Sequence, residues 1–102
     1  MDYMVTAKVS PTEWSPYRGK FAIAYLSFFV RCSNESEVVP AYHRLLQEDG
    51  LNEVEALGAG YFVPSPHDPE LRDTILKALN DDGVFSILCG AAPGDNRKFS
   101  RN

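Results

Sequence analysis

The stretch "KFAIAYLSFFVRC", residues 20–32, is apolar on both faces of an extended strand. Successive side chains of a strand point to opposite faces, so one face carries Phe21, Ile23, Tyr25 and Phe29. The even-numbered residues of the run, also mostly apolar, form the other face. A strand without a polar face lies inside a sheet whose two faces are both covered. We therefore predict a central strand here.

A repeated phrase marks the ends of two predicted helices. "RLLQEDGL", residues 44–51, and "KALNDDGV", residues 77–84, share the order basic, apolar, apolar, amide, acid, acid, glycine, apolar. Glycine adopts the left-handed conformation that ends many helices without a steric cost. The phrase therefore predicts that one helix ends at Gly50 and the other at Gly83.

The starts of these helices are also encoded. Asp68 is a good N-cap, and Pro69 suits the first helical position of the second helix. For the first helix, the proline at position 40 is tolerated only near the first turn, which favours a cap at Ser36. Both helices carry apolar residues at helical spacing.

Other segments predict strands. Residues 3–10 alternate apolar and polar side chains, which is typical of a strand with one wet face, and residues 84–91 read as the last strand. Residues 51–63 contain Gly58-Ala59-Gly60, which is compatible with a hairpin or with one longer, bulged strand.

These elements predict an α+β fold. The order favours a ferredoxin-like two-layer sandwich, with an antiparallel sheet, two helices on one face and an extra N-terminal strand. At 102 residues and 44% hydrophobic content the chain suits a single core. We expect one domain over residues 1–93 and a basic C-terminal tail over residues 94–102.

Charge and cysteine content narrow the function. Ten basic against 14 acidic residues give a net charge of −4, which argues against nucleic acid as a partner. Residues 21–30 form the longest apolar run, too short to span a bilayer, so we expect a cytoplasmic protein with no membrane partner. Cys32 and Cys89 have no metal-site spacing and read as buried, reduced thiols.

Four acids lie near the helix ends: Glu48, Asp49, Asp81 and Asp82. Carboxylates are unfavourable there, because the helix dipole is negative at its C-terminus. If both helices run the same way on one face, these acids share a rim that suits a basic partner. The alternative is that they are solvated and keep the protein soluble. The basic tail, with Arg97, is a further candidate for docking on this rim.

An apolar sheet face and an aromatic loop are further candidate binding surfaces. With both helices on one side, either Phe21, Ile23, Tyr25 and Phe29 or the alternate set of the same strand needs cover. A protein partner, a second copy, or the chain's own N-terminal strand, long loop and tail would supply it. The loop after the first strand holds residue types common in binding hot spots. These loop residues are Trp14, Tyr17 and Arg18, and a lid over the core is the alternative for Trp14.

For catalysis the sequence offers little. His43 and His67 have no nucleophile or carboxylate at a spacing that links them, and no phosphate-binding or nucleophile motif occurs. We predict no catalytic residue, metal site or cofactor. An active site assembled from distant residues leaves no local motif, so the sequence leaves the question of an enzyme open.

Taken together, these features predict a small acidic cytosolic protein-binding module. By analogy, stand-alone domains of this kind serve as stoichiometric inhibitors, such as immunity or anti-defence proteins. The alternative is a dimeric domain that binds a small regulatory ligand. A third reading is a small enzyme that uses one of the two histidines.

Overall fold

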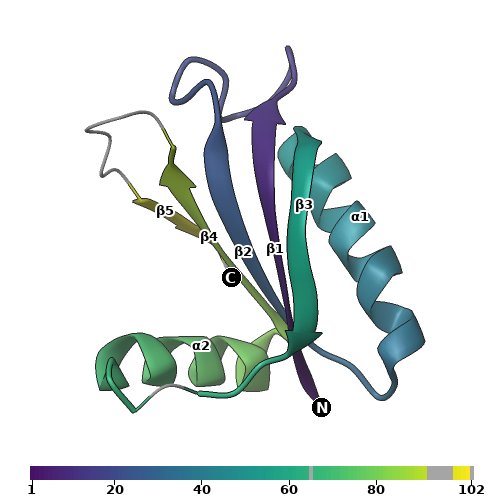
Figure 1. The fold of residues 1–102 in the computed structure, drawn as a ribbon, viewed down its shortest axis with the longest axis vertical. Coiled ribbons are helices and arrows are strands. Elements are labelled where there is room, and N and C mark those ends of the chain that lie inside the picture. Colours follow the sequence, from purple (N-terminus) through teal and green to yellow (C-terminus); the bar gives the residue numbers. More distant parts are fainter. Residues whose placement is uncertain (65, 92–97, 102) are drawn as a thin grey trace.

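A computed structural model describes residues 1–64, 66–91 and 98–101. The strands form one sheet, and two α-helices pack beside it (Figure 1). Their order is β1 (Asp2–Pro11), β2 (Ala24–Arg31), the 3-10 helix η1 (Glu35–Glu37), α1 (Val38–Asp49), β3 (Leu51–Tyr61), α2 (Pro69–Asp81), β4 (Val84–Gly90) and β5 (Lys98–Arg101). The predicted α+β class is confirmed.

The sheet order is β3-β1-β2-β4-β5, and every neighbouring pair is antiparallel. The ferredoxin-like order is not confirmed. The N-terminal strand β1 is not an addition at the edge, because it lies between β2 and β3. Residues 51–61 form one strand rather than a hairpin, with register shifts against β1 at two places. β5 comes from the segment that the sequence predicted to be a tail.

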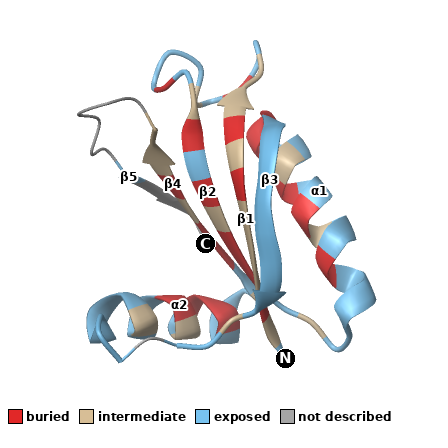
Figure 2. Ribbon diagram, viewed as in Figure 1, coloured by how far each residue is buried: buried red, intermediate tan, exposed pale blue. Residues whose placement is uncertain are grey.

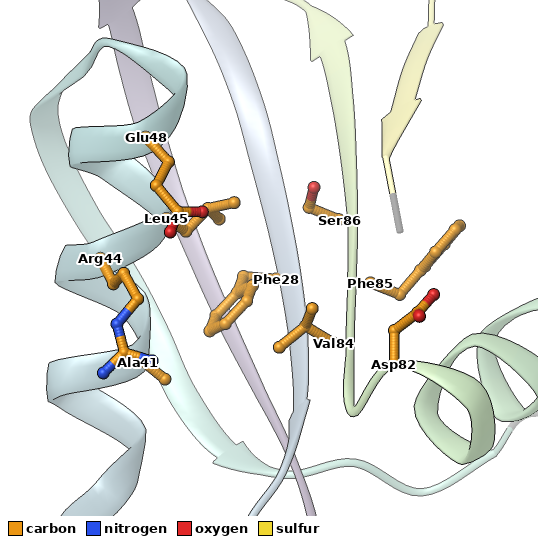
Figure 3. Close-up of a pocket in the computed structure, with 9 residues that line it drawn as sticks. All are labelled: Phe28, Ala41, Arg44, Leu45, Glu48, Asp82, Val84, Phe85 and Ser86. Carbon is orange, nitrogen blue, oxygen red and sulfur yellow. The ribbon is translucent and has the colours of Figure 1, made fainter.

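The two helices lie on opposite faces of the sheet, so the prediction that they share one face is wrong. Tyr42 of α1 packs in one cluster with Phe28, whereas Leu79 of α2 packs in another with Phe29. Phe28 and Phe29 are consecutive in β2 and therefore point to opposite faces. Figure 3 shows the sheet between the two helices. A strand apolar on both faces needs two covers, and each helix supplies one.

Each face has its own core. On the α1 face, Leu26 and Phe28 are 1% exposed and Ala7 is fully buried, while Phe85 is 5% exposed on the α2 face. α1 turns its buried residues toward the sheet, whereas the edge strand β3 is exposed along nearly all of its length (Figure 2). The cover is thus most complete over β2, is partial over β1 and ends at β3.

The predicted helix ends are largely confirmed. Asp68 accepts a hydrogen bond from the backbone N–H of Leu71, and α2 begins at Pro69. Gly50 and Gly83 have φ angles of 63° and 76°, in the left-handed region. The predicted cap at Ser36 is wrong, because Asn34 caps η1, which leads directly into α1. Glu37 lies three residues after Asn34 and completes a capping box with it. Ser36 has no Glu or Gln three residues later and therefore cannot form such a box.

Candidate functional site

A cleft of about 390 Å³ opens between α1 and β4 on the α1 face of the sheet (Figure 3). Phe28 and Leu45 form a buried apolar floor, and Val84 is 37% exposed at its side. Charged side chains surround this floor. Arg44 and Glu48 come from α1, and Asp82 comes from the turn between α2 and β4.

The two copies of the repeated phrase supply most of this cleft. Arg44 and Glu48 are four residues apart in the first copy and so lie on one face of α1. Asp82 and Val84 belong to the second copy, where Gly83 turns the chain from α2 into β4. The two helices end at opposite ends of the sheet, since Gly50 lies beside Thr12 after β1 and Gly83 lies beside Arg31 at the end of β2. The cavity therefore joins the last turns of α1 to the start of β4.

A second hollow of about 480 Å³ adjoins the cleft. Ala41, Arg44, Asp82 and Val84 line both, so the two form one continuous groove along α1. The far end of the groove is lined by residues that connect β2 to α1, including Cys32, Ser33 and Glu37. Burial raises the pKa of the Cys32 thiol, which therefore stays protonated at neutral pH.

The predicted acidic rim is found only in part. Glu48 and Asp82 line the same cavity. Asp49 is 5% exposed, so it is not available at a surface, and its carbonyl oxygen accepts a hydrogen bond from the Ser15 hydroxyl. Asp81 is exposed but does not line the cavity. The four acids do not form one surface because the helices that carry them lie on opposite faces.

The predicted apolar surface is mostly buried. Phe29 is 5% exposed under α2, and Phe21 is 7% exposed in the α1-side core. Tyr25, at 44% exposure, and the half-buried Ile23 remain accessible beside a shallow hollow of about 270 Å³. The prediction of a continuous uncovered face is therefore wrong.

The aromatic loop divides into a packed and an exposed part. Tyr17 packs against Phe21, with ring centroids 5.7 Å apart. Trp14 is 65% exposed, which contradicts the interpretation of this side chain as a lid over the core. Arg18 is exposed, and its guanidinium donates to the carbonyl oxygen of Glu13. Trp14 and Arg18 remain candidates for a binding loop.

The two histidines are far apart in the fold. His43 lies in α1, with its ring 5.8 Å from that of Tyr42, and His67 precedes α2. Within the described residues, no group of three or more His, Cys, Asp and Glu side chains is placed to hold a metal ion. The predicted docking of the tail cannot be followed at Arg97, which lies outside the described residues. β5 places the backbone of Arg101 beside Ser86.

Sequence reasoning missed several residues of the cleft. Arg44 and Val84 belong to the repeated phrase, and Phe28 and Ser86 lie in the predicted strands. The phrase itself carried part of the signal, because Arg44 from the start of the first copy and Val84 from the end of the second line the cavity together with Glu48 and Asp82. Only the acids were selected, since charge at a helix end is visible without knowing the packing.

No protein-family model matches this chain, and neither a curated protein nor a solved structure matches it significantly. In the described part of the chain, neither helix has the length and apolar character needed to cross a bilayer.

Proposed function

We propose that this chain is a small protein-binding domain whose cleft between α1 and β4 takes a short segment of a partner protein. One observation carries the proposal. The two copies of the repeated phrase meet at a single cavity, where Arg44 and Glu48 of one copy face Asp82 and Val84 of the other. An apolar floor inside a charged rim is the usual anatomy of a protein-binding site.

The lining indicates the chemistry of the bound segment. Phe28, Leu45 and Val84 offer an apolar surface to one side chain of the partner, which would act as the anchor. Two carboxylates and one guanidinium surround it, so the rim favours a Lys or Arg next to the anchor. Rim charges contribute mainly to the association rate and to specificity. An acidic domain that captures a basic segment in this way is suited to act as a stoichiometric inhibitor.

A displayed library of random peptides tests this proposal. We expect the selected peptides to pair an aliphatic or aromatic residue with a neighbouring Lys or Arg. Asp82→Lys should weaken the binding of a selected peptide by about tenfold or more, because the mutation reverses a charge beside the anchor. Asp81→Lys is the matched control, since Asp81 is the adjacent acid and does not line the cavity.

Two outcomes would count against the proposal. Selection of acidic peptides would contradict the predicted sign of the rim, and equal effects of the two lysine substitutions would place binding elsewhere. Folding of both variants is checked by circular dichroism, because both positions lie at the end of α2.

A small-molecule ligand is the second candidate for the same cleft. Its volume of about 390 Å³ falls within the range of about 300–1,000 Å³ that is common for such sites. Ser86, which is 5% exposed, lies at its wall. A thermal-shift screen of metabolites would support this candidate if a compound stabilised the wild type and not Asp82→Lys, and if no peptide were selected.

A further inference from the structure

We propose that a second copy of this chain pairs with the free edge of β3, so that two sheets join into one. This inference concerns the β3 edge of the sheet, whereas the cleft lies at β4, and it does not depend on the proposed function. β3 is an edge strand, and 10 of its 11 residues are exposed. Figure 2 shows this exposure along nearly all of the strand.

The second half of β3 and the two residues that follow it, together residues 56–63, lack the features that keep an edge strand unpaired. Lysine, proline and inward-pointing charges commonly protect such edges. Residues 56–63 contain no charged residue and no proline. Large apolar side chains are exposed there instead, with Leu57 at 45%, Tyr61 at 58% and Val63 at 79%. An edge of this composition is expected to be covered by another strand.

The two halves of β3 differ in regularity and in charge. From Gly58 to Tyr61 the strand pairs with β1 residue by residue. One register shift, at Val54, falls in the first half, which also carries Glu53 and Glu55, and the other falls at Leu57, just before the regular stretch. Charges and bulges oppose edge pairing, so the first half is protected, and the strand is open to pairing from Gly58 onward.

The open half is complementary to itself. In a two-fold antiparallel pairing centred on Ala59, Leu57 lies opposite Tyr61 of the second copy, and Gly58 lies opposite Gly60 of the second copy. Glu53 and Glu55 of one copy then lie opposite the uncharged end of the other copy's strand or beyond it. No carboxylate therefore faces another carboxylate. Apolar cross-strand pairs stabilise such a ladder, and the same patch meets itself, as two-fold symmetry requires.

Helix α1 adds to the surface that the second copy covers. A hollow of about 440 Å³ separates α1 from β3 and is lined by Val39, Leu57 and Ala59, among others. Val39 is 58% exposed. A two-fold axis perpendicular to the sheet keeps the α1 helices of both copies on the same face. Their Val39 side chains therefore flank the paired strands, and the contact extends beyond the backbone ladder.

Sedimentation velocity over a range of protein concentrations tests the pairing. We expect a reversible monomer–dimer equilibrium in the wild type. Gly60→Lys should raise the dimer dissociation constant at least about tenfold, because it places like charges near the two-fold axis. The monomer should tolerate this change, since Gly60 has no positive φ and a Cβ there would meet no atom within 4 Å.

Asn52→Lys is the matched control, because it adds the same charge to the protected half of β3 and should leave the dissociation constant unchanged. A cysteine at position 59 tests the register. Opposed residues in an antiparallel pair have Cα atoms about 4.5–5.5 Å apart, which is within the range of about 4.4–6.8 Å for a disulfide. Ala59→Cys should therefore form an intermolecular 59–59 disulfide much faster than Asn52→Cys does, with the linked peptides identified by mass spectrometry.

A wild-type protein that stays monomeric at every concentration would overturn this inference. So would a dimer that Gly60→Lys does not weaken, or equal cross-linking of the two cysteine variants. None of these results bears on the cleft, which lies on the other side of α1 and is tested by the Asp82 and Asp81 substitutions.

Discussion

The hydroxyl of Ser15 donates a 2.7 Å hydrogen bond to the carbonyl oxygen of Asp49, and this contact fastens the loop after β1 to the end of α1. Both residues are buried, at 6% and 5% exposure. The backbone N–H of Thr12 adds a bond of 2.8 Å to the carbonyl oxygen of Gly50. The first copy of the repeated phrase therefore ends against a packed loop, whereas a Cβ added at Gly83 in the second copy would meet no atom within 4 Å.

Alanine substitutions at the two phrase glycines should differ in their cost. Gly83→Ala should lower the free energy of unfolding by about 1–2 kcal/mol, because a residue with a Cβ is strained at positive φ. Gly50→Ala carries the same strain, and its Cβ would also lie 2.9 Å from Ser15 Cα and 2.9 Å from Thr12 Oγ1. We expect the cost at Gly50 to exceed that at Gly83 by at least about 1 kcal/mol, measured by urea denaturation. Equal costs would mean that the loop at Thr12 and Ser15 moves aside without lowering the free energy of unfolding.

Truncation of Trp14 should have little effect on stability. The side chain is 65% exposed, so Trp14→Ala should change the free energy of unfolding by no more than about 0.5 kcal/mol. Phe28→Ala is the comparison, since Phe28 is 1% exposed and its loss should cost about 3–5 kcal/mol. Chemical denaturation of both variants measures the difference. A large loss at Trp14 would restore the interpretation of this residue as a lid.

The ion pair between Asp2 and Arg31 predicts a specific acid sensitivity. Arg31 Nε donates to Asp2 Oδ1 at 2.8 Å and Nη2 donates to Oδ2 at 3.1 Å, and this bonding lowers the pKa of Asp2 below its ordinary value of 3.8. A lowered pKa in the folded state contributes stability that is present above pH 3.8 and is lost as the pH falls through the lower folded value.

Asp2→Asn should therefore reduce stability at neutral pH and flatten the loss of stability in acid. Urea midpoints collected between about pH 2 and 6 would measure this change across the range of the Asp2 titration. Arg31→Gln should produce the same flattening, and the double variant should add little further. If either single variant kept the full acid sensitivity of the wild type, the ion pair would not be its source. Because both side chains are partly exposed, the effect should shrink in high salt.

Local features of the sequence determined where α2 begins and where both helices end. Gly50, Gly83, Asp68 and Pro69 each act through their own backbone conformation or a hydrogen bond within three residues, so no distant partner is needed to read them. The same holds for β2, whose alternating side chains showed that both of its faces would be buried. Among the residues that line the cleft, local features identified only Glu48 and Asp82, as acids near helix ends.

Only the tertiary structure decided which face each helix covers and which residues meet at the cleft. An amphipathic helix carries an apolar stripe that fits either face of a sheet, so the stripe of α2 did not specify Phe29 rather than Phe28 as its partner. The strand order depends on backbone pairing between segments far apart in the chain, and β-strands of similar composition compete for those positions. For that reason the exposure of β3, and the meeting of Arg44 with Val84, followed from the packing and not from the pattern of residues.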